Sequence, residues 1–237
     1  MIYNFLVFIF YYLLILISIL GYGLFFLKIL KIKNNSNNFG YAGLFGIYIL
    51  LVYSYLSNLI IAHSEIHNIL IHLIGIILFI FLTKKNYLEY KKEIIFTSIV
   101  FLLVFCSLLQ FKNHDDFPYY HFPYTYYLTQ QSLYIGVGQF NHGFRTPSSI
   151  FYINSLFYLP FAKFYLLNFF SVLILGFANI VLLKKIHSYF ISFTFKKEKI
   201  NFTNFLSLLS FTFLNIFFYR ISEYGTDRAA MILVILL

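Results

Sequence analysis

Apolar residues occur along this chain in long blocks, separated by short segments rich in lysine, asparagine or histidine. A helix needs roughly 20 predominantly apolar residues to cross the hydrocarbon core of a bilayer. The pattern therefore predicts an all-α, polytopic membrane protein with about six complete transmembrane helices. The expected spans cover about residues 3–27, 41–61, 69–82, 94–111, 164–183 and 202–219. A seventh begins near Met231 and is cut short, so we expect the chain to be the N-terminal part of a longer protein.

The composition excludes a water-soluble domain. The 237 residues are 61% hydrophobic and 11% charged, with a mean hydropathy of +0.81, whereas soluble domains carry roughly 25% charged residues. The single cysteine, Cys106, lies in an apolar run, which excludes both a disulfide framework and a cysteine metal cluster. The net charge of +9 would suggest nucleic acid in a soluble protein. In a membrane protein the position of each cation matters more, and we expect the lipid bilayer, not nucleic acid, as a partner.

Lysines concentrate on one side of the predicted membrane. When the loops are assigned alternately to the two sides, 12 of the 17 basic residues fall on one side. Cytoplasmic loops carry an excess of lysine and arginine, so this side is predicted to be inside and the N-terminus outside. Lys28 follows the first span, and no lysine precedes it, which predicts a retained helix and not a cleaved signal peptide.

Three segments on the predicted outer side hold most of the reactive side chains. They are the loop 62–68, the long stretch 112–163 and the segment 220–230. Together they carry all three arginines, all three aspartates and five of the seven histidines, whereas the charged residues of the inner loops are mainly lysines. A loop that served only solubility would also be rich in lysine and asparagine. The segregation therefore favours a site at the outer face.

The long outer stretch has internal structure. Pro118 and Pro123 lie five residues apart and oppose a helix before Thr125. Further on, Thr146 as an N-cap and Pro147 at the first helical position begin an apolar run, which predicts a helix of about 13 residues. Because this helix is too short to span, we expect it to lie in the membrane interface with its aromatic face among the headgroups. That face consists of Phe151, Tyr152, Phe157 and Tyr158. The alternative is a re-entrant or irregular buried segment.

Two pairs of acidic residues stand at two predicted helix mouths on the outer side. Asp115 and Asp116 follow the fourth span, and Glu223 and Asp227 lie four residues apart after the sixth. Water is scarce at that depth, where a carboxylate can hold a divalent cation or act as a base. If the pairs converge, all four residues are candidate catalytic residues, and Asp116 and Asp227 are candidate ligands for Mg²⁺ or Mn²⁺. The alternative is ordinary polarity at helix ends.

The outer arginines suit a phosphate group, because a guanidinium group binds two phosphate oxygens at once. Arg145 and Arg228 are the candidate substrate-binding arginines, and Arg220 lies close to the second acidic pair. The alternative role for these arginines is a salt bridge to Glu223 or Asp227.

The outer histidines offer several kinds of chemistry. His121 and His142 are candidate substrate-binding residues that can act as an acid, a base or a hydrogen-bond partner, and their spacing does not distinguish these roles. His63 and His67 are four residues apart and would share one face of a helix, as in some zinc sites. The simpler interpretation is that they are the polar ends of spans.

Residues 94–237 combine a span, a long outer loop that opens with an acidic pair, an amphipathic interfacial helix, a return span and a second acidic cluster. This order resembles the GT-C superfamily of membrane glycosyltransferases. The resemblance implies a polyprenyl-phosphate-linked sugar as donor, with Asp115 or Asp116 in the first acidic role and Glu223 or Asp227 in the second. Residues 1–93, with three spans, would then be an N-terminal addition. The stretch from His114 to Ser149 is also similar to an uncharacterised family of large bacterial membrane proteins, which implies a bacterial inner (plasma) membrane.

These observations lead to three hypotheses from different classes. The first is a glycosyltransferase that moves a sugar from a polyprenyl-phosphate donor to an acceptor on the outer face. The second is a transporter or flippase of a lipid-linked saccharide, which would usually bury charges near the bilayer midplane. The third is a non-enzymatic membrane subunit, in which the outer acidic residues do not converge.

Overall fold

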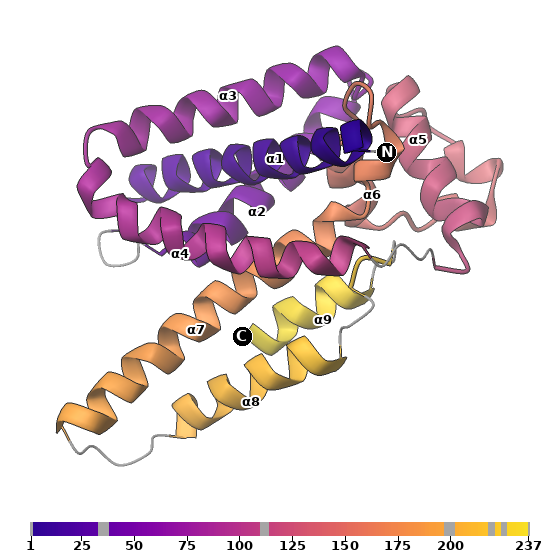
Figure 1. Ribbon diagram of the computed structural model, residues 1–237. Helices are drawn as coiled ribbons and strands as arrows, with labels where there is room; N and C mark the ends of the chain where they lie inside the picture. The colour runs from indigo at the N-terminus through magenta and orange to yellow at the C-terminus, as the bar shows by residue number, and fades with distance from the viewer. Residues whose placement is uncertain are drawn as a thin grey trace.

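The computed structural model describes residues 2–32, 38–109, 114–196, 202–217, 221–223 and 227–236 (Figure 1). Within these ranges the regular structure is helical, apart from one isolated bridge between Leu159 and Lys163. The all-α prediction is therefore confirmed for the described part of the chain. The principal helices are α1 (Ile2–Ile29), α2 (Phe39–Asn58), α3 (Glu65–Lys84), α4 (Tyr87–Phe105), α7 (Phe169–Lys196), α8 (Phe202–Phe217) and α9 (Asp227–Leu236).

Five of the helical segments are long and apolar enough to cross a membrane. They are Phe5–Ile29, Phe39–Asn58, Glu65–Lys84, Tyr87–Leu109 and Phe164–Phe190. The fourth includes a 3₁₀ turn, η1 (Cys106–Leu109), after α4. These helices are consistent with an integral membrane protein. The sixth predicted span corresponds to α8, which has only 16 residues, so its crossing stays a prediction.

Two helices begin earlier than the apolar pattern indicated. α3 begins at Glu65, where the side chain of Ser64 accepts a hydrogen bond from the backbone N–H of His67 at 3.4 Å. α4 begins at Tyr87 and includes charged residues before its apolar part, so the boundary expected between residues 93 and 94 falls inside this helix. Polar first turns therefore extend both helices beyond their apolar blocks.

α1 lies against α2 and α3 at very close range. A Cβ atom added to Gly21 would lie 1.8 Å from the carbonyl oxygen of Gly75 in α3, and one added to Gly23 would lie 1.6 Å from that of Ala42 in α2. Glycine is required at both positions because any side chain would collide with the neighbouring backbone. Small residues at helix interfaces are typical of packing in membranes, where close backbone contact replaces the hydrophobic driving force.

α7 is the most deeply buried helix of the described spans, and it contacts α2, α4, α8 and α9. Its residue Phe177 is fully buried and packs edge-on against Phe101 of α4, with 4.9 Å between ring centroids. By contrast, α1, α3 and α4 leave large apolar side chains exposed, among them Leu6, Ile77 and Leu102. Such outward apolar side chains are what a lipid-facing surface requires.

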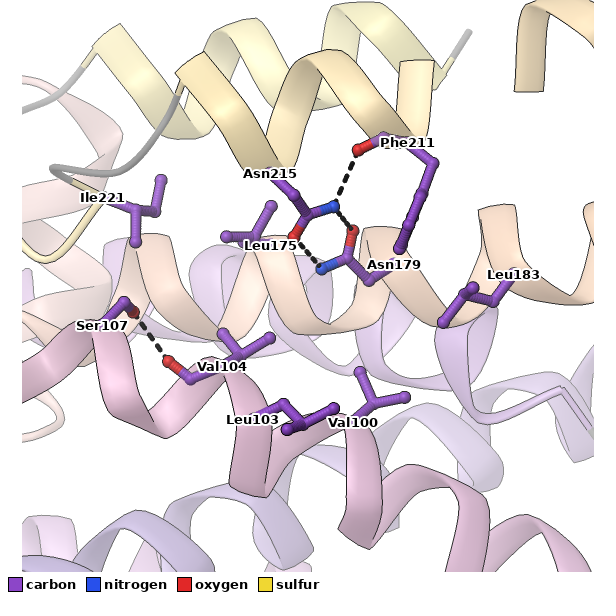
Figure 2. Close-up of a pocket in the computed structure, with 10 residues that line it drawn as sticks. All are labelled: Val100, Leu103, Val104, Ser107, Leu175, Asn179, Leu183, Phe211, Asn215 and Ile221. Atoms are coloured by element: carbon purple, nitrogen blue, oxygen red, sulfur yellow. Dashed lines mark hydrogen bonds between the residues drawn. The ribbon is translucent and has the colours of Figure 1, made fainter. Parts of the chain in front are cut away.

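A pair of asparagine side chains joins α7 to α8. Asn179 and Asn215 donate to each other's carbonyl oxygens, both at 2.9 Å, and Asn215 also donates to the backbone carbonyl of Phe211 at 2.8 Å (Figure 2). Polar side chains that pair across helices in this way stabilise membrane helix packing. The pair borders a small cavity of about 220 Å³ whose other walls are mainly aliphatic side chains of α4 and α7.

The segment between α4 and α7 forms a compact cap at one end of the bundle (Figure 1). It contains a single π-helical turn, η2 (Phe117–His121), then α5 (Phe122–Gln130) and α6 (Ser149–Ser155). The prediction that the two prolines prevent a helix before Thr125 is wrong. Pro118 and Pro123 each lie within the first two positions of a helical segment, where the missing N–H group breaks no hydrogen bond.

The expected interfacial helix is also wrong in length and environment. α6 has seven residues instead of about 13, and its N-cap is Ser148, not Thr146. The four aromatic residues expected among lipid headgroups are all buried in the protein: Phe151, Tyr152, Phe157 and Tyr158. The reason is that α6 packs against α2, α5 and α7. The structure thus shows a short helix buried in the protein, which matches the alternative to an interfacial helix in its burial but not in being irregular.

Candidate functional site

The two ends of the bundle differ in chemistry. One end, hereafter the loop end, carries η2, α5, α6 and the beginning of α9 (Figure 1). The opposite end, hereafter the lysine-rich end, carries the last turn of α1, the last turn of α3 and the first turns of α4. The described acidic residues predicted to form a site all lie at the loop end.

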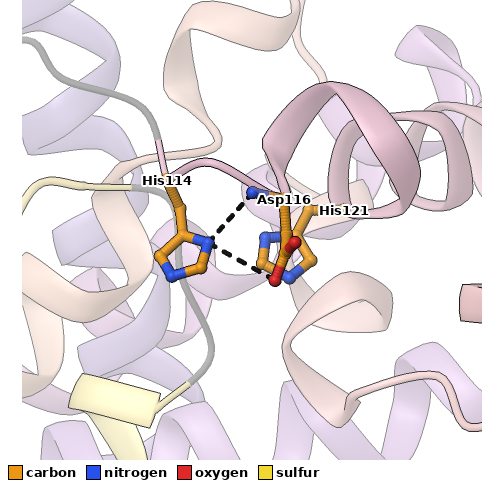
Figure 3. Close-up of side chains that lie close together, drawn as sticks. All are labelled: His114, Asp116 and His121. Carbon is orange, nitrogen blue, oxygen red and sulfur yellow. Dashed lines mark hydrogen bonds and ion pairs between the residues drawn. The ribbon is translucent and has the colours of Figure 1, made fainter.

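Three side chains that could ligate a metal ion meet at the loop end. His114, Asp116 and His121 each offer one ligand atom, and these atoms all lie within 4.8 Å of one another (Figure 3). Nδ1 of His114 lies 3.7 Å from the Oδ2 atom of Asp116 and accepts a hydrogen bond of 3.1 Å from the backbone N–H of Asp116. His121 is buried, whereas the side chains of His114 and Asp116 are 42% and 45% exposed. His121 therefore fixes the group to the protein interior, and the side chains of His114 and Asp116 face solvent.

The backbone explains why these three residues meet. The N–H group of His121 donates to the carbonyl oxygen of Asp116 at 3.4 Å, which closes the π-helical turn η2. This turn places the end of η2 close to the residues that precede it. The ring of His121 therefore lies 5.5 Å from the ring of His114. π-helical turns occur frequently at functional sites. The ring of Phe151 from α6 packs against the ring of His121, with 5.2 Å between the two centroids.

Tyr120 connects this group to the second acidic pair. Its hydroxyl donates to Oδ2 of Asp116 at 3.2 Å. The pKa of Tyr120 is raised mainly by burial, then by this hydrogen bond, by the charge of Asp116 and by the charge of Asp227. The first residue of α9 is therefore near enough to act on a tyrosine that contacts Asp116. The remaining acid of the first pair, Asp115, is exposed to solvent beside the group.

A cavity of about 410 Å³ adjoins the group. Tyr120 and Phe151, which contact Asp116 and His121 respectively, both line it. The rest of its wall is formed by Asn141, His142, Gly143, Thr146 and Ser148. Of the predicted substrate-binding residues, His142 thus belongs to the wall. Arg145 does not line the cavity; its side chain is exposed, and its Nε donates to the carbonyl oxygen of Gly138 at 3.4 Å.

Glu223 and Arg228 form an ion pair at the beginning of α9. Nη2 of Arg228 lies 2.6 Å from Oε2 of Glu223, whose side chain is only 6% exposed. The salt bridge expected as the alternative to phosphate binding is therefore present for Arg228. Its other terminal nitrogen, Nη1, is buried and has no hydrogen-bond partner among the described residues. Arg220 lies outside the described residues.

The possible metal ligands at the loop end differ from the predicted ligands, Asp116 and Asp227. Among the described residues, the group that could hold a metal contains Asp116 but not Asp227, and it adds His114 and His121. Two imidazole nitrogens and one carboxylate oxygen suit Zn²⁺, Mn²⁺ or Fe²⁺ better than Mg²⁺, which prefers oxygen ligands alone. Sequence reasoning missed His114 as a donor. The only available signal was its place two residues before Asp116.

A family model described as a domain of unknown function, DUF8201, matches residues 5–237, nearly the whole chain. The chain belongs to the DUF8201 family. No curated protein and no solved structure matches it. The description of DUF8201 assigns no activity, so function has to be argued from the geometry of the site.

In this DUF8201 protein, His63 and His67 belong to a hydrogen-bond network near the loop end. His63 is fully buried, and its two ring nitrogens contact the hydroxyl groups of Ser57 at 2.8 Å and Ser155 at 2.5 Å. The ring nitrogens of His67 contact the hydroxyl of Tyr53 at 2.7 Å and the side-chain oxygen of Asn68 at 3.0 Å. Because all four ring nitrogens have protein partners, the network favours the simpler interpretation, polar ends of spans, over a zinc site.

The network predicts that this DUF8201 protein loses stability in mild acid. Burial is the main reason that the pKa of His63 falls from 6.5 to about 3, and His67 lowers it further. A base whose folded-state pKa is depressed must gain a proton on unfolding, so its contribution is complete above pH 6.5 and is lost as the pH falls towards 3. The expected loss is about 2 kcal/mol at pH 5.

Unfolding in mixed detergent micelles between pH 7.5 and 5 measures this loss. The variant His63→Gln keeps hydrogen-bonding capacity without a titrating ring, so its stability is expected to fall less steeply across the same range. An equal decline in wild type and variant would show that His63 is not the group responsible.

Proposed function

We propose that this DUF8201 protein is a metal-dependent glycosyltransferase of the membrane surface. It transfers a sugar from a polyprenyl-phosphate donor to an acceptor hydroxyl at the loop end, which we place on the outer face of a bacterial plasma membrane with the N-terminus outside. One observation supports this most strongly: His114, Asp116 and His121 converge beside a cavity of about 410 Å³. The metal, the phosphate and the sugar would then all bind at the loop end.

The three donors are suited to a divalent cation. When bound, the cation would neutralise negative charge on the phosphate that leaves with the lipid. Arg228 lies at the beginning of α9, next to Asp227, whose charge acts on Tyr120, and the Nη1 atom of Arg228 has no protein acceptor among the described residues. That nitrogen is suited to a phosphate oxygen, with Glu223 holding the guanidinium group in place.

Asp115 is the residue best placed to act as a general base. It is exposed and lies next to Asp116, but it does not belong to the donor group. In the proposed step the acceptor hydroxyl gives its proton to the Asp115 carboxylate while its oxygen bonds to the anomeric carbon. The bond from that carbon to the phosphate oxygen breaks, and polyprenyl phosphate leaves. Attack opposite to the leaving group inverts the anomeric configuration.

The cavity wall is suited to a sugar ring. His142, Asn141 and Ser148 offer polar atoms for sugar hydroxyls, and the ring of Phe151 offers an apolar face. The sugar would lie between this wall and the donor group, because Tyr120 borders both. This arrangement supports sugar transfer more than a hydrolysis that needs only water.

Transport of a lipid-linked saccharide is the second candidate, and fewer observations favour it. Among the described Asp, Glu, His, Lys and Arg residues, His72 lies farthest inside a span, and it is buried. Its ring nitrogens contact the hydroxyl of Ser18 at 3.0 Å and the backbone carbonyl of Leu156 at 3.1 Å. Both contacts join helices, which indicates a packing role and not a substrate path.

The decisive experiment uses the purified protein in phosphatidylcholine nanodiscs. Radiolabelled polyprenyl-phosphate hexoses and pentoses are supplied in turn, with Mn²⁺ or Zn²⁺ and a mixture of saccharide acceptors. We expect release of polyprenyl phosphate that requires the protein and stops with EDTA. If no sugar is released, but the same lipids cross liposome membranes faster when the protein is present, the transporter is correct. If neither occurs, the non-enzymatic subunit is correct.

A further inference from the structure

A second cavity, of about 580 Å³, lies at the lysine-rich end, at the opposite end of the bundle from the candidate site. It is bordered by the last turns of α1 and α3 and by the turn that leads into α4. Its polar wall consists of Lys28, Lys31, Lys85, Asn86 and Tyr90. The proposed transferase does not use any of these residues.

Positive charge in this cavity is not neutralised within the described part of the protein. None of the three lysines forms an ion pair with a described residue, although Lys28 lies over the ring of Phe81 at 5.8 Å. The nearby carboxylate of Glu89 accepts a hydrogen bond from Asn86 at 3.1 Å. Three cations and one anion leave the cavity strongly positive.

Helix ends account for only part of this charge. Lys28 lies in the last turn of α1 and Lys85 is the C-cap of α3, and a cation is favourable at both places because helix C-termini carry partial negative charge. Lys31 is different. It follows α1 with a φ angle of +55°, a left-handed conformation in which glycine is the usual residue. Helix termination alone would be served better by glycine, so the lysine side chain has another use.

The apolar half of the wall indicates what kind of anion fits. Leu24, Leu27, Ile32 and Leu82 line the same cavity. Just outside it, Ile29 and Leu30 are 57% and 48% exposed, as on a surface that faces acyl chains. A free phosphate ion would gain nothing from these side chains, whereas a phospholipid would place its phosphate at the ammonium groups and its chains against them. Basic pockets between membrane helices are known to bind anionic headgroups.

We propose that this cavity binds the phosphate headgroup of an anionic phospholipid from the leaflet at the lysine-rich end. The bound lipid would tie the ends of α1 and α3 to the beginning of α4. It is distinct from the sugar-donor lipid of the proposed function, and the inference does not depend on that function.

The test compares thermal unfolding of the detergent-purified protein with added phosphatidylglycerol, with phosphatidylcholine and with inorganic phosphate. We expect phosphatidylglycerol to raise the unfolding temperature by several degrees and the other two to have little effect. The variant Lys28→Gln/Lys31→Gln/Lys85→Gln should lose most of this rise. The control Lys84→Gln/Lys91→Gln/Lys92→Gln removes equal charge at the same end, outside the cavity wall, and should keep it.

A single substitution makes the test sharper. Lys31→Gly should be more stable than wild type without lipid, since glycine adopts the left-handed conformation freely, and yet respond less to phosphatidylglycerol. These opposite changes also separate lipid binding from a folding defect in the triple variant. An equal loss in both triple variants, an undiminished response of Lys31→Gly, or equal protection by inorganic phosphate or phosphatidylcholine would overturn the proposal.

Discussion

Replacing Asp116 by asparagine is expected to weaken divalent-cation binding at the loop end by at least about 100-fold. The carboxylate is the one anionic donor in the group, and the two imidazoles that remain are neutral ligands. Asparagine has nearly the same shape and can still accept the hydrogen bond from Tyr120, so the fold should persist. Equilibrium dialysis with Mn²⁺ and with Zn²⁺ at pH 7.5 measures the change without requiring a substrate.

Asp115→Asn is the matched control, because it removes the same charge one residue away. It should bind the cation as wild type does, yet lower sugar transfer by about 10²- to 10⁴-fold through loss of the general base. Equal cation binding in wild type and both variants would remove the metal site from the proposal. Weaker binding in Asp115→Asn than in Asp116→Asn would reverse the two roles.

The apolar spans could be predicted from the sequence because the bilayer imposes a simple rule. Within lipid every backbone polar group must bond internally, so an apolar block of sufficient length has to be a helix. Five such blocks appear as helices in the structure. Their ends were less predictable. The first turn of α4 carries Glu89, and polar residues of this kind extend a helix beyond the part that apolar counting can identify.

The environment of α6 could not be predicted for a physical reason. The lipid phase and the protein interior are both apolar, so the side chains of Phe151 and Phe157 are equally compatible with either environment. What decides between them is whether other helices leave room, and that depends on α2, α5 and α7 together. In the structure α6 occupies the space between these helices, and the aromatic residues of α6 belong to the protein core.

The candidate site was predictable in its members more than in its arrangement. Asp116 and His121 were both chosen from the sequence, but for separate roles, and Pro118 and Pro123 were expected to oppose a helix before Thr125. The π-helical turn η2 instead brings Asp116 and His121 together with His114. Likewise, Arg228 was predicted to bind phosphate, and in the structure its Nη2 atom forms an ion pair with Glu223.

Arg228→Gln is expected to lower the stability of the protein by about 3 kcal/mol. The carboxylate of Glu223 is almost fully buried and lies 2.6 Å from the guanidinium group, so removing the cation leaves a buried charge without its main partner. Arg228→Lys restores a positive charge at the same place and should recover much of the stability. It should still weaken binding of the phosphate-linked donor, because lysine lacks the second donor arm that Nη1 provides.

Unfolding in mixed detergent micelles gives these stabilities, and the double variant Arg228→Gln/Glu223→Gln completes a thermodynamic cycle. Two neutral side chains leave no buried charge unpaired, so the double variant should be more stable than Arg228→Gln alone. If Arg228→Gln proves as stable as wild type, the pair does not hold α9 in place. The support that Glu223 gives to a phosphate-binding Arg228 would then be lost from the proposed mechanism as well.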